Sequence, residues 1–254
     1  MEVRDVQEPL TQMPAPAGLE VRLAATAGEI GQAQRLRYAV FGEEMGARVA
    51  GAALGLDRDR FDPFCDHLIV RERDGGRVVG TYRMLPPAQR RRAGGWYCAG
   101  EFDVGGLEAF GDQVVEIGRA CVHPAYRSGR VISLLWTGLL RYVLAHGCAY
   151  LMGCASLDTV DGGHIAASIC RHLLQHHLAP PPWRAVPRRA FVLEGWREIP
   201  DAPLPPLLKG YLRLGAQACG EPAWDGDFDT ADVLMVLPVA RTNPRYVERL
   251  LRAA

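Results

Sequence analysis

The chain has 254 residues, 48% hydrophobic and 23% charged, so it can bury a sizeable core and is not a disordered chain. Lys plus Arg equals Asp plus Glu at 29 each, which gives no indication of nucleic-acid binding or of bulk attraction to an anionic membrane. The seven cysteines form no C-x-x-C pair, no apolar run reaches the roughly 18 residues of a membrane span, and no basic-then-apolar leader opens the chain. We expect a soluble protein of a reducing, cytoplasmic compartment.

Residues 1–18 are polar and proline-bearing, and they predict a flexible lead-in to a single domain over 19–254. Residues 19–24 alternate between apolar and polar side chains, as a short strand does. Thr26 and Glu29 then have capping-box spacing, which predicts that a helix begins there.

Arg37 interrupts the apolar face of this predicted helix. On a helical wheel it lies among Ile30, Ala33, Val40 and Phe41. Two interpretations stay open: a long side chain that reaches a backbone carbonyl, or an arginine aimed into a pocket.

Two apolar runs around residues 74–76 predict an antiparallel hairpin. In its second strand Arg83 points to the same side as Val79 and Thr81, so it is expected to face inward. Residues 88–111 are expected to form a loop. The three arginines at 90–92 are typical of a solvated loop, and they could also meet an acidic partner.

Residues 114–156 predict a strand (114–122), a basic turn (HPAYRSGR), a helix (about 129–145) and a second strand (149–156). In such a βαβ unit, the turn that enters the helix presents free N–H groups and the positive helix end, which together favour an anion. Glu116 and Arg119 interrupt the otherwise apolar first strand. Buried charges are costly unless they are paired or used, so both are candidate functional residues.

The segment from about residue 158 to 205 is too long for a plain connection, and we interpret it as an insertion with its own helix. His172 and His176 have zinc-ligand spacing there, but no Glu or Cys partner accompanies them, so no metal is expected. A helix near 204–216 and a buried strand near 230–240 follow. The element order predicts a mixed α/β sheet with antiparallel strands first and one central parallel pair.

This order, with its turn HPAYRSGR, resembles the GNAT N-acyltransferase superfamily over roughly residues 19–240. The resemblance implies a splayed central strand pair, helices on both faces of the sheet and a helical insertion after the fifth strand. Acetyl-CoA-using members carry R/Q-x-x-G-x-G/A, whereas this turn keeps only one glycine, out of register. The turn is therefore expected to hold the phosphopantetheine of acyl carrier protein rather than CoA, through Arg127, Ser128, Gly129, Arg130 and Val131.

Longer motifs narrow the resemblance. LRYAVF (36–41), the segment from Asp62 to Asp66, VGTYRMLP (79–86) and Glu116-x-x-Arg119 resemble the signature of the acyl-homoserine-lactone synthases. EIGRACVHPAYRSGRVISLLWTGLLRYV, YLMGCASLD and LLKGYLRLGAQACGEPAWDGDFDTADVLMVLP are similar to the L-ornithine N-acyltransferases. That family implies transfer of a 3-hydroxyacyl chain from acyl carrier protein to the α-amino group of ornithine, with no separate cofactor; peripheral contact with the inner membrane face stays open.

Amide formation from a thioester needs a deprotonated amine, a donor to the carbonyl oxygen and a proton for the departing thiol. Glu116 could deprotonate the amine, directly or through a water, if burial raises its pKa. A bulge at Gly118 would bring Glu116 and Arg119 to one side of the strand and splay it. Backbone N–H groups near Cys121 and Val122 would then stabilise the oxyanion.

The resemblance also assigns Tyr211 to the position from which GNAT enzymes protonate the thiolate, although Ala216 replaces the Phe of Y-x-x-x-G-F. It places Phe41 in the acceptor site. Inward-facing Arg37, Arg83 or Arg119 could hold the acceptor carboxylate bidentately. The acidic candidates for the ornithine ammonium are Asp62, Asp66, Glu43 and Glu44, and the same acids could instead form structural ion pairs with the arginines.

Other functions stay open from the sequence. The acceptor could be lysine, glycine or glutamine, or the chain could make an acyl-homoserine-lactone type of signal. A CoA-dependent acetyltransferase is disfavoured by the turn, and a non-catalytic module that binds carrier protein is disfavoured by Glu116.

Overall fold

The computed structural model describes residues 18–242, so all but the last residue of the predicted lead-in lies outside it. One mixed sheet forms the centre, in the order β1-β2-β3-β5-β6-β10-β8, with β9 also pairing with β10. Its strands are β1 (Leu19–Leu23), β2 (Asp66–Glu72), β3 (Val78–Leu85), β5 (Val114–Val122), β6 (Tyr150–Asp158), β8 (Gln217–Ala218), β9 (Ala223–Asp225) and β10 (Thr230–Pro238). A small second sheet pairs β4 (Phe102–Asp103) with β7 (Val186–Pro187).

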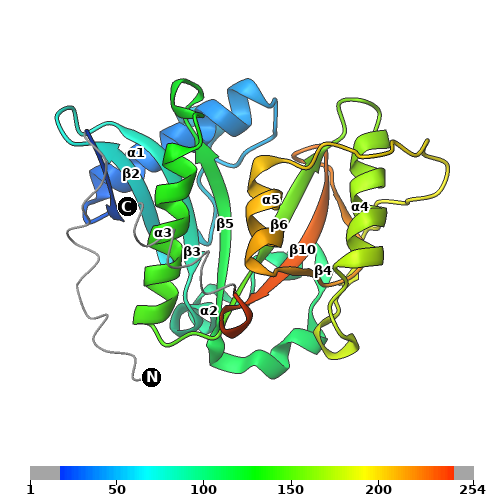
Figure 1. Ribbon diagram of the computed structural model, residues 1–254. Coiled ribbons are helices and arrows are strands. Elements are labelled where there is room, and N and C mark those ends of the chain that lie inside the picture. The colour runs from blue at the N-terminus through cyan, green and yellow to red at the C-terminus, as the bar shows by residue number, and fades with distance from the viewer. Residues whose placement is uncertain (1–17, 243–254) are drawn as a thin grey trace.

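Helices cover both faces of the large sheet. They are α1 (Ala27–Arg37), which continues as a π-helix over Tyr38–Glu44, and α2 (Pro87–Ala93), α3 (Arg130–Ala145), α4 (His164–His176) and α5 (Pro206–Leu214). In Figure 1, α3 crosses one half of the sheet, while α5 and α4 cover the half formed by β6 and β10. α1 packs on the face opposite α3, where its Ala33 and Leu36 meet Ile69 of β2.

The central strand pair diverges. β5 and β6 run parallel but pair only between Val114–Glu116 and Tyr150–Met152, whereas β6 pairs with β10 along its whole length. Figure 1 shows the two strands separating toward their carboxyl ends. Just past the last pair, a Cβ on Gly153 would lie 2.2 Å from the Ile117 carbonyl oxygen. Only glycine lets the strands approach so closely before they part.

The predicted mixed fold, its element order and the parallel pair are confirmed. The predicted loop over 88–111 is wrong in part, because α2 occupies its first residues. Pro87 stands at the first helical position, where its fixed φ suits a helix, and Gly94 ends the helix at φ +85°. The predicted insertion, about 158–205, contains α4 and then a largely irregular segment with β7.

Candidate active site

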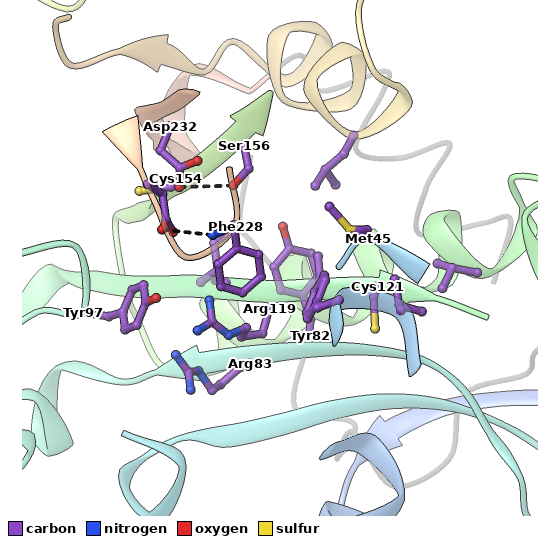
Figure 2. A pocket seen from close by; sticks show the side chains of 18 of the residues that line it. Met45, Tyr82, Arg83, Tyr97, Arg119, Cys121, Cys154, Ser156, Phe228 and Asp232 are labelled. Carbon is purple, nitrogen blue, oxygen red and sulfur yellow. Dashed lines mark hydrogen bonds between the residues drawn. The ribbon is translucent and has the colours of Figure 1, made fainter. Parts of the chain in front are cut away.

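A cavity of about 330 Å³ opens where β5 and β6 separate. Figure 2 shows Arg83 and Arg119 on one side of it and Asp232, Ser156 and Cys154 on another. The remaining lining residues come from seven segments of the chain: Val40, Phe41, Met45, Tyr82, Tyr97, Glu101, Glu116, Ile117, Gly118, Ala120, Cys121, Val122, Arg127, Leu207, Tyr211, Asp225 and Phe228. The cavity thus joins side chains that are far apart in the sequence.

A β-bulge in β5 shapes one wall of this cavity. Thr81 pairs with Cys121 but Arg83 pairs with Gly118, so β5 has one residue more than β3. Arg119 has φ +52°, a left-handed value that is rare for an arginine, whereas Gly118 does not have a positive φ. The bulge was predicted at Gly118, and the structure centres it on Arg119 instead. It leaves both Glu116 and Arg119 on the cavity wall, as the chemistry requires.

Glu116 is buried, and its two carboxylate oxygens accept hydrogen bonds from backbone amides. The N–H of Tyr97 donates at 2.6 Å and the N–H of Cys98 at 2.7 Å. Burial raises the pKa of Glu116, against the opposing effect of these two hydrogen bonds. Each oxygen keeps a further lone pair, so it can still accept a hydrogen bond from an amine or a water in the cavity.

Six charged side chains form an ion-pair network beneath the cavity. Arg37 Nε lies 2.9 Å from Asp57 Oδ2, and Arg37 Nη2 lies 2.7 Å from Asp62 Oδ1. Arg83 lies 2.7 Å from Asp59 and 3.0 Å from Asp62. Arg119 lies 3.1 Å from Asp57 and 3.7 Å from Asp59. Burial opposes ionisation of Asp62, but the charges of Arg37 and Arg83 outweigh it and lower its pKa.

The candidate acceptor-binding residues fall into two groups: those that lie away from the cavity and those that line it. Arg37 has no exposed surface and Asp62 is buried, and neither is among the described residues that line the cavity. Asp66 also lies away from the cavity, where it accepts from the Tyr142 hydroxyl on α3. The structure does not bring these three to the cavity, and their contacts are those of structural partners. Arg83, Arg119 and Phe41 do line the cavity.

Opposite the arginines, the cavity has an acidic wall that sequence reasoning missed. Asp232 is buried and accepts from Thr230 at 2.7 Å and from Ser156 at 3.2 Å. Burial, together with the neighbouring charges of Asp232 and Asp225, raises the pKa of Glu101. An acidic residue near the start of the buried strand predicted near 230–240 was the signal for Asp232. Glu101 lies in an aperiodic segment that gave no signal.

Glu101, Cys154 and Asp232 bring their donor atoms within 4.8 Å of one another. Burial and the neighbouring carboxyl groups raise the pKa of the Cys154 thiol well above its usual value. The expectation of no metal stays a prediction.

Tyr211 and Tyr82 also line the cavity, and their hydroxyl groups are hydrogen-bonded to each other. Burial raises the pKa of Tyr211, and the hydrogen bond from Tyr82 opposes this effect. Tyr211 therefore carries its proton at neutral pH, as a proton donor must.

At the carboxyl end of β5, the chain enters the basic turn HPAYRSGR at the edge of the cavity, which Val122 and Arg127 line. His123 N–H donates to Val79 of β3, so strand alternation directs the backbone groups of Val122 away from β3, toward the gap left by β6. The same alternation directs the Cys121 N–H toward β3, so of the two predicted oxyanion donors only Val122 is well placed. Arg127 bonds to Val122 O at 3.1 Å and forms a bidentate pair with Glu44 at 2.6 and 2.7 Å.

The turn ends at Gly129, whose φ of +92° leads into α3. Ser128, Gly129 and Arg130 are exposed, whereas Val131 is buried against Gly80, where a Cβ would lie 2.4 Å from Val131 Cγ1. No side chain caps the first turn of α3, so its N–H groups are open to an anion.

Comparisons with known proteins agree with this geometry. Residues 36–137 match the model of the acetyltransferase (GNAT) domain. The solved structure of FeeM, an N-acyl amino acid synthase from uncultured soil microbes, matches with a TM-score of 0.52 at 14% identity over 87% of this chain and 91% of that chain. The CoA-dependent acyl-homoserine lactone synthase BjaI also has a TM-score of 0.52, at 16% identity over 92% of this chain and 88% of that one. The splayed strands and the cavity between them are those of the GNAT fold.

Sequence relatives are closer. The L-ornithine N(alpha)-acyltransferases of Rhizobium meliloti and Brucella abortus are each 39% identical, over 91% and 90% of this chain and 83% and 87% of their own length. That of Rhodobacter capsulatus is 39% identical over 92% of this chain and 95% of its own. The chain belongs to the L-ornithine N(alpha)-acyltransferase family.

Proposed function

We propose that the enzyme transfers a 3-hydroxyacyl chain from acyl carrier protein to the α-amino group of L-ornithine, the first step of ornithine-lipid synthesis. The observation that carries this proposal is the contrast between the two cavity walls, with Arg83 and Arg119 on one and the carboxyl groups of Glu101, Asp225 and Asp232 on the other. Burial raises the pKa of Glu101 and of Asp232, and a bound ammonium group would favour their ionised forms. A zwitterion with a second, distal cation matches such a pair of walls. The names of the sequence relatives support the same acceptor.

The acceptor carboxylate is proposed to bind Arg119. Its guanidinium lies 4.7 Å from the Phe228 ring centroid and 5.0 Å from that of Tyr97, which fixes the plane of the fork. Arg83 is proposed to contribute only positive charge beside Arg119, since its guanidinium is already paired with Asp59 and Asp62. The distal ammonium is proposed to bind Glu101, whose carboxyl group is hydrogen-bonded to Asp232 and accepts from the Cys154 thiol at 3.9 Å.

The acceptor is proposed to enter from a second pocket. This pocket, of about 490 Å³, shares Tyr97, Glu101 and Asp225 with the cavity and adds Arg48 and Arg189 at its rim. The acyl donor would approach from the opposite side, past Arg127. Separate entrances suit a reaction in which two substrates meet at one bond.

For the donor, we propose the phosphopantetheine arm of acyl carrier protein. The uncapped first turn of α3 and exposed Arg130 offer one anion site, which suits a single phosphodiester. Val122 N–H would then stabilise the thioester oxyanion, and Glu116 would take the amine proton, directly or through a water.

The product is a single-chain amphiphile, and each buried CH₂ group contributes about 0.8 kcal/mol to membrane binding. We propose that it leaves by peripheral contact with a membrane. Within residues 18–242, no helix is both long and apolar enough to span a bilayer.

The test measures thiol release from 3-hydroxyacyl carrier protein and from the matching CoA thioester, each with and without L-ornithine. Release that needs both the carrier thioester and ornithine supports the proposal. Equal rates with CoA would overturn the choice of donor, and release independent of ornithine would overturn the choice of acceptor.

A further inference from the structure

The hydroxyl groups of Tyr82 and Tyr211 contact each other although the residues come from β3 and α5. Tyr82 is 1% exposed and Tyr211 is 6% exposed. Both line the cavity, and Figure 2 shows Tyr82 among the lining side chains. Among the residues that the structure describes, neither hydroxyl has another hydrogen-bond partner.

The packing around Tyr211 fixes this contact. Its ring meets Trp136 of α3 edge-on, with the centroids 4.9 Å apart and the planes at 85°. At the preceding residue, a Cβ on Gly210 would lie 3.0 Å from Trp136 Nε1, so α5 sits tightly on α3. The Tyr211 hydroxyl consequently has little freedom to leave the cavity wall.

The direction of the hydrogen bond follows from the proton count. A hydroxyl group has one proton to donate. Tyr82 is the less exposed of the two, so if Tyr211 donated to Tyr82, the Tyr82 proton would be left without an acceptor among the described residues, which is costly. If Tyr82 donates to Tyr211, the Tyr82 proton is paired, and the proton of the more exposed Tyr211 is free to point into the cavity.

We propose that Tyr82 is a positioning residue for proton donation to the leaving thiol. Its hydroxyl donates to Tyr211 Oη, which aims the Tyr211 proton at the thioester sulfur and stabilises the Tyr211 oxygen as that proton leaves. As the tetrahedral intermediate collapses, the C–S bond breaks, its electron pair goes to sulfur, and the Tyr211 proton forms the thiol. Glu116 holds the proton taken from the amine, and solvent returns both groups to their starting state. This inference rests on the proposed function.

The experiment compares Tyr82→Phe, Tyr211→Phe and the double variant in ornithine-dependent acyl transfer. Tyr142→Phe is the matched control, because Tyr142 is also buried but its hydroxyl bonds to Asp66, away from the cavity. Each variant is measured with the carrier thioester and with an acyl thioester of an aromatic thiol. An aromatic thiolate has a low pKa and leaves without a proton donor.

With the carrier thioester, we expect Tyr82→Phe to lower kcat about 10- to 100-fold, since it removes a hydrogen bond to a developing negative charge. The KM for the thioester should stay unchanged, and the double variant should be no slower than Tyr211→Phe, because the two hydroxyls act as one unit. With the aromatic thioester, both single variants should recover to within about threefold of the wild type.

Three results would overturn the inference: an unchanged kcat in Tyr82→Phe, losses that multiply in the double variant, or an equal loss with the aromatic thioester. A similar loss in Tyr142→Phe would also overturn it, because the effect would then come from packing. A wild-type enzyme that makes no ornithine-dependent product would overturn the proposed function itself, and the inference with it.

Discussion

The Nε atom of Arg37, which has no exposed surface, lies 2.9 Å from the buried Asp57 carboxylate. Asp57 also lies 3.1 Å from Arg119, on the cavity wall. Arg37 of α1 does not line the cavity, but through Asp57 it is linked to Arg119, which does. The Asp57 carboxylate therefore holds the side chain of Arg119, whose backbone has a left-handed φ of +52°.

We predict that Arg37→Met destabilises the protein by about 3–5 kcal/mol, because it leaves the buried network with three aspartates and only two arginines, and so with one uncompensated negative charge. Urea denaturation measures the loss. The control is Arg91→Met, which removes an exposed pair with Asp112 at 3.3 Å and should change stability by less than about 0.5 kcal/mol. Equal effects of the two variants would contradict the buried network.

Glu116→Gln should lower kcat by roughly 10²- to 10⁴-fold at pH 7 if Glu116 is the base. An amide also leaves the Tyr97 or Cys98 N–H facing an NH₂ group, so stability should fall by about 1–3 kcal/mol. A base must be ionised, and burial raises the pKa of Glu116. The wild-type rate should therefore rise with pH through a pKa above 4.5.

The rate of the Gln variant should lack this rise with pH. Its activity relative to the wild type should recover between about pH 7 and 9.5, where more of the amine is already deprotonated. The check is a pH–rate profile of each form. A fully active Gln variant at pH 7 would reduce Glu116 to a support for the Tyr97–Cys98 backbone.

Glu101→Gln should raise the KM for ornithine at least about tenfold, because it removes the carboxyl group that would ionise to pair with the distal ammonium. L-norvaline lacks that ammonium, so its slower reaction should be unaffected. Glu221→Gln, at an exposed site, is the matched control. Equal losses with ornithine and norvaline would place Glu101 in the chemistry or the fold rather than in acceptor recognition.

Arg130→Glu should raise the apparent KM for the carrier thioester by about tenfold without changing that for ornithine, since acyl carrier proteins are expected to be acidic. Arg127 is a poorer probe because its bidentate pair with Glu44 would become a like-charge pair. Arg92→Glu is the control: α2 follows β3 near the start of β5, away from the turn in Figure 1. A larger effect at Arg92 would move the docking surface to α2.

Periodicity was enough to predict the central strands, α3 and the inward direction of Arg37 and Arg83. Sequence reasoning named Asp62 as a possible ion-pair partner of these arginines, and Asp62 does pair with both. It missed Asp57 and Asp59, because they lie in an irregular segment whose path depends on tertiary contacts. For the same reason Asp62 and Asp66 were among the acidic residues expected to bind the ornithine ammonium, whereas the structure brings Glu101 to the cavity.

The most direct test of the account is the mass spectrum of the product formed from 3-hydroxyacyl carrier protein and an equimolar mixture of ornithine, lysine, glycine and glutamine. Fragmentation distinguishes an acyl group on the α-nitrogen from one on the distal nitrogen. The account predicts N(α)-acyl-ornithine as the main product, reduced in Glu101→Gln. Acylation of the distal nitrogen, or an acyl-glycine or acyl-glutamine formed as readily, would contradict it.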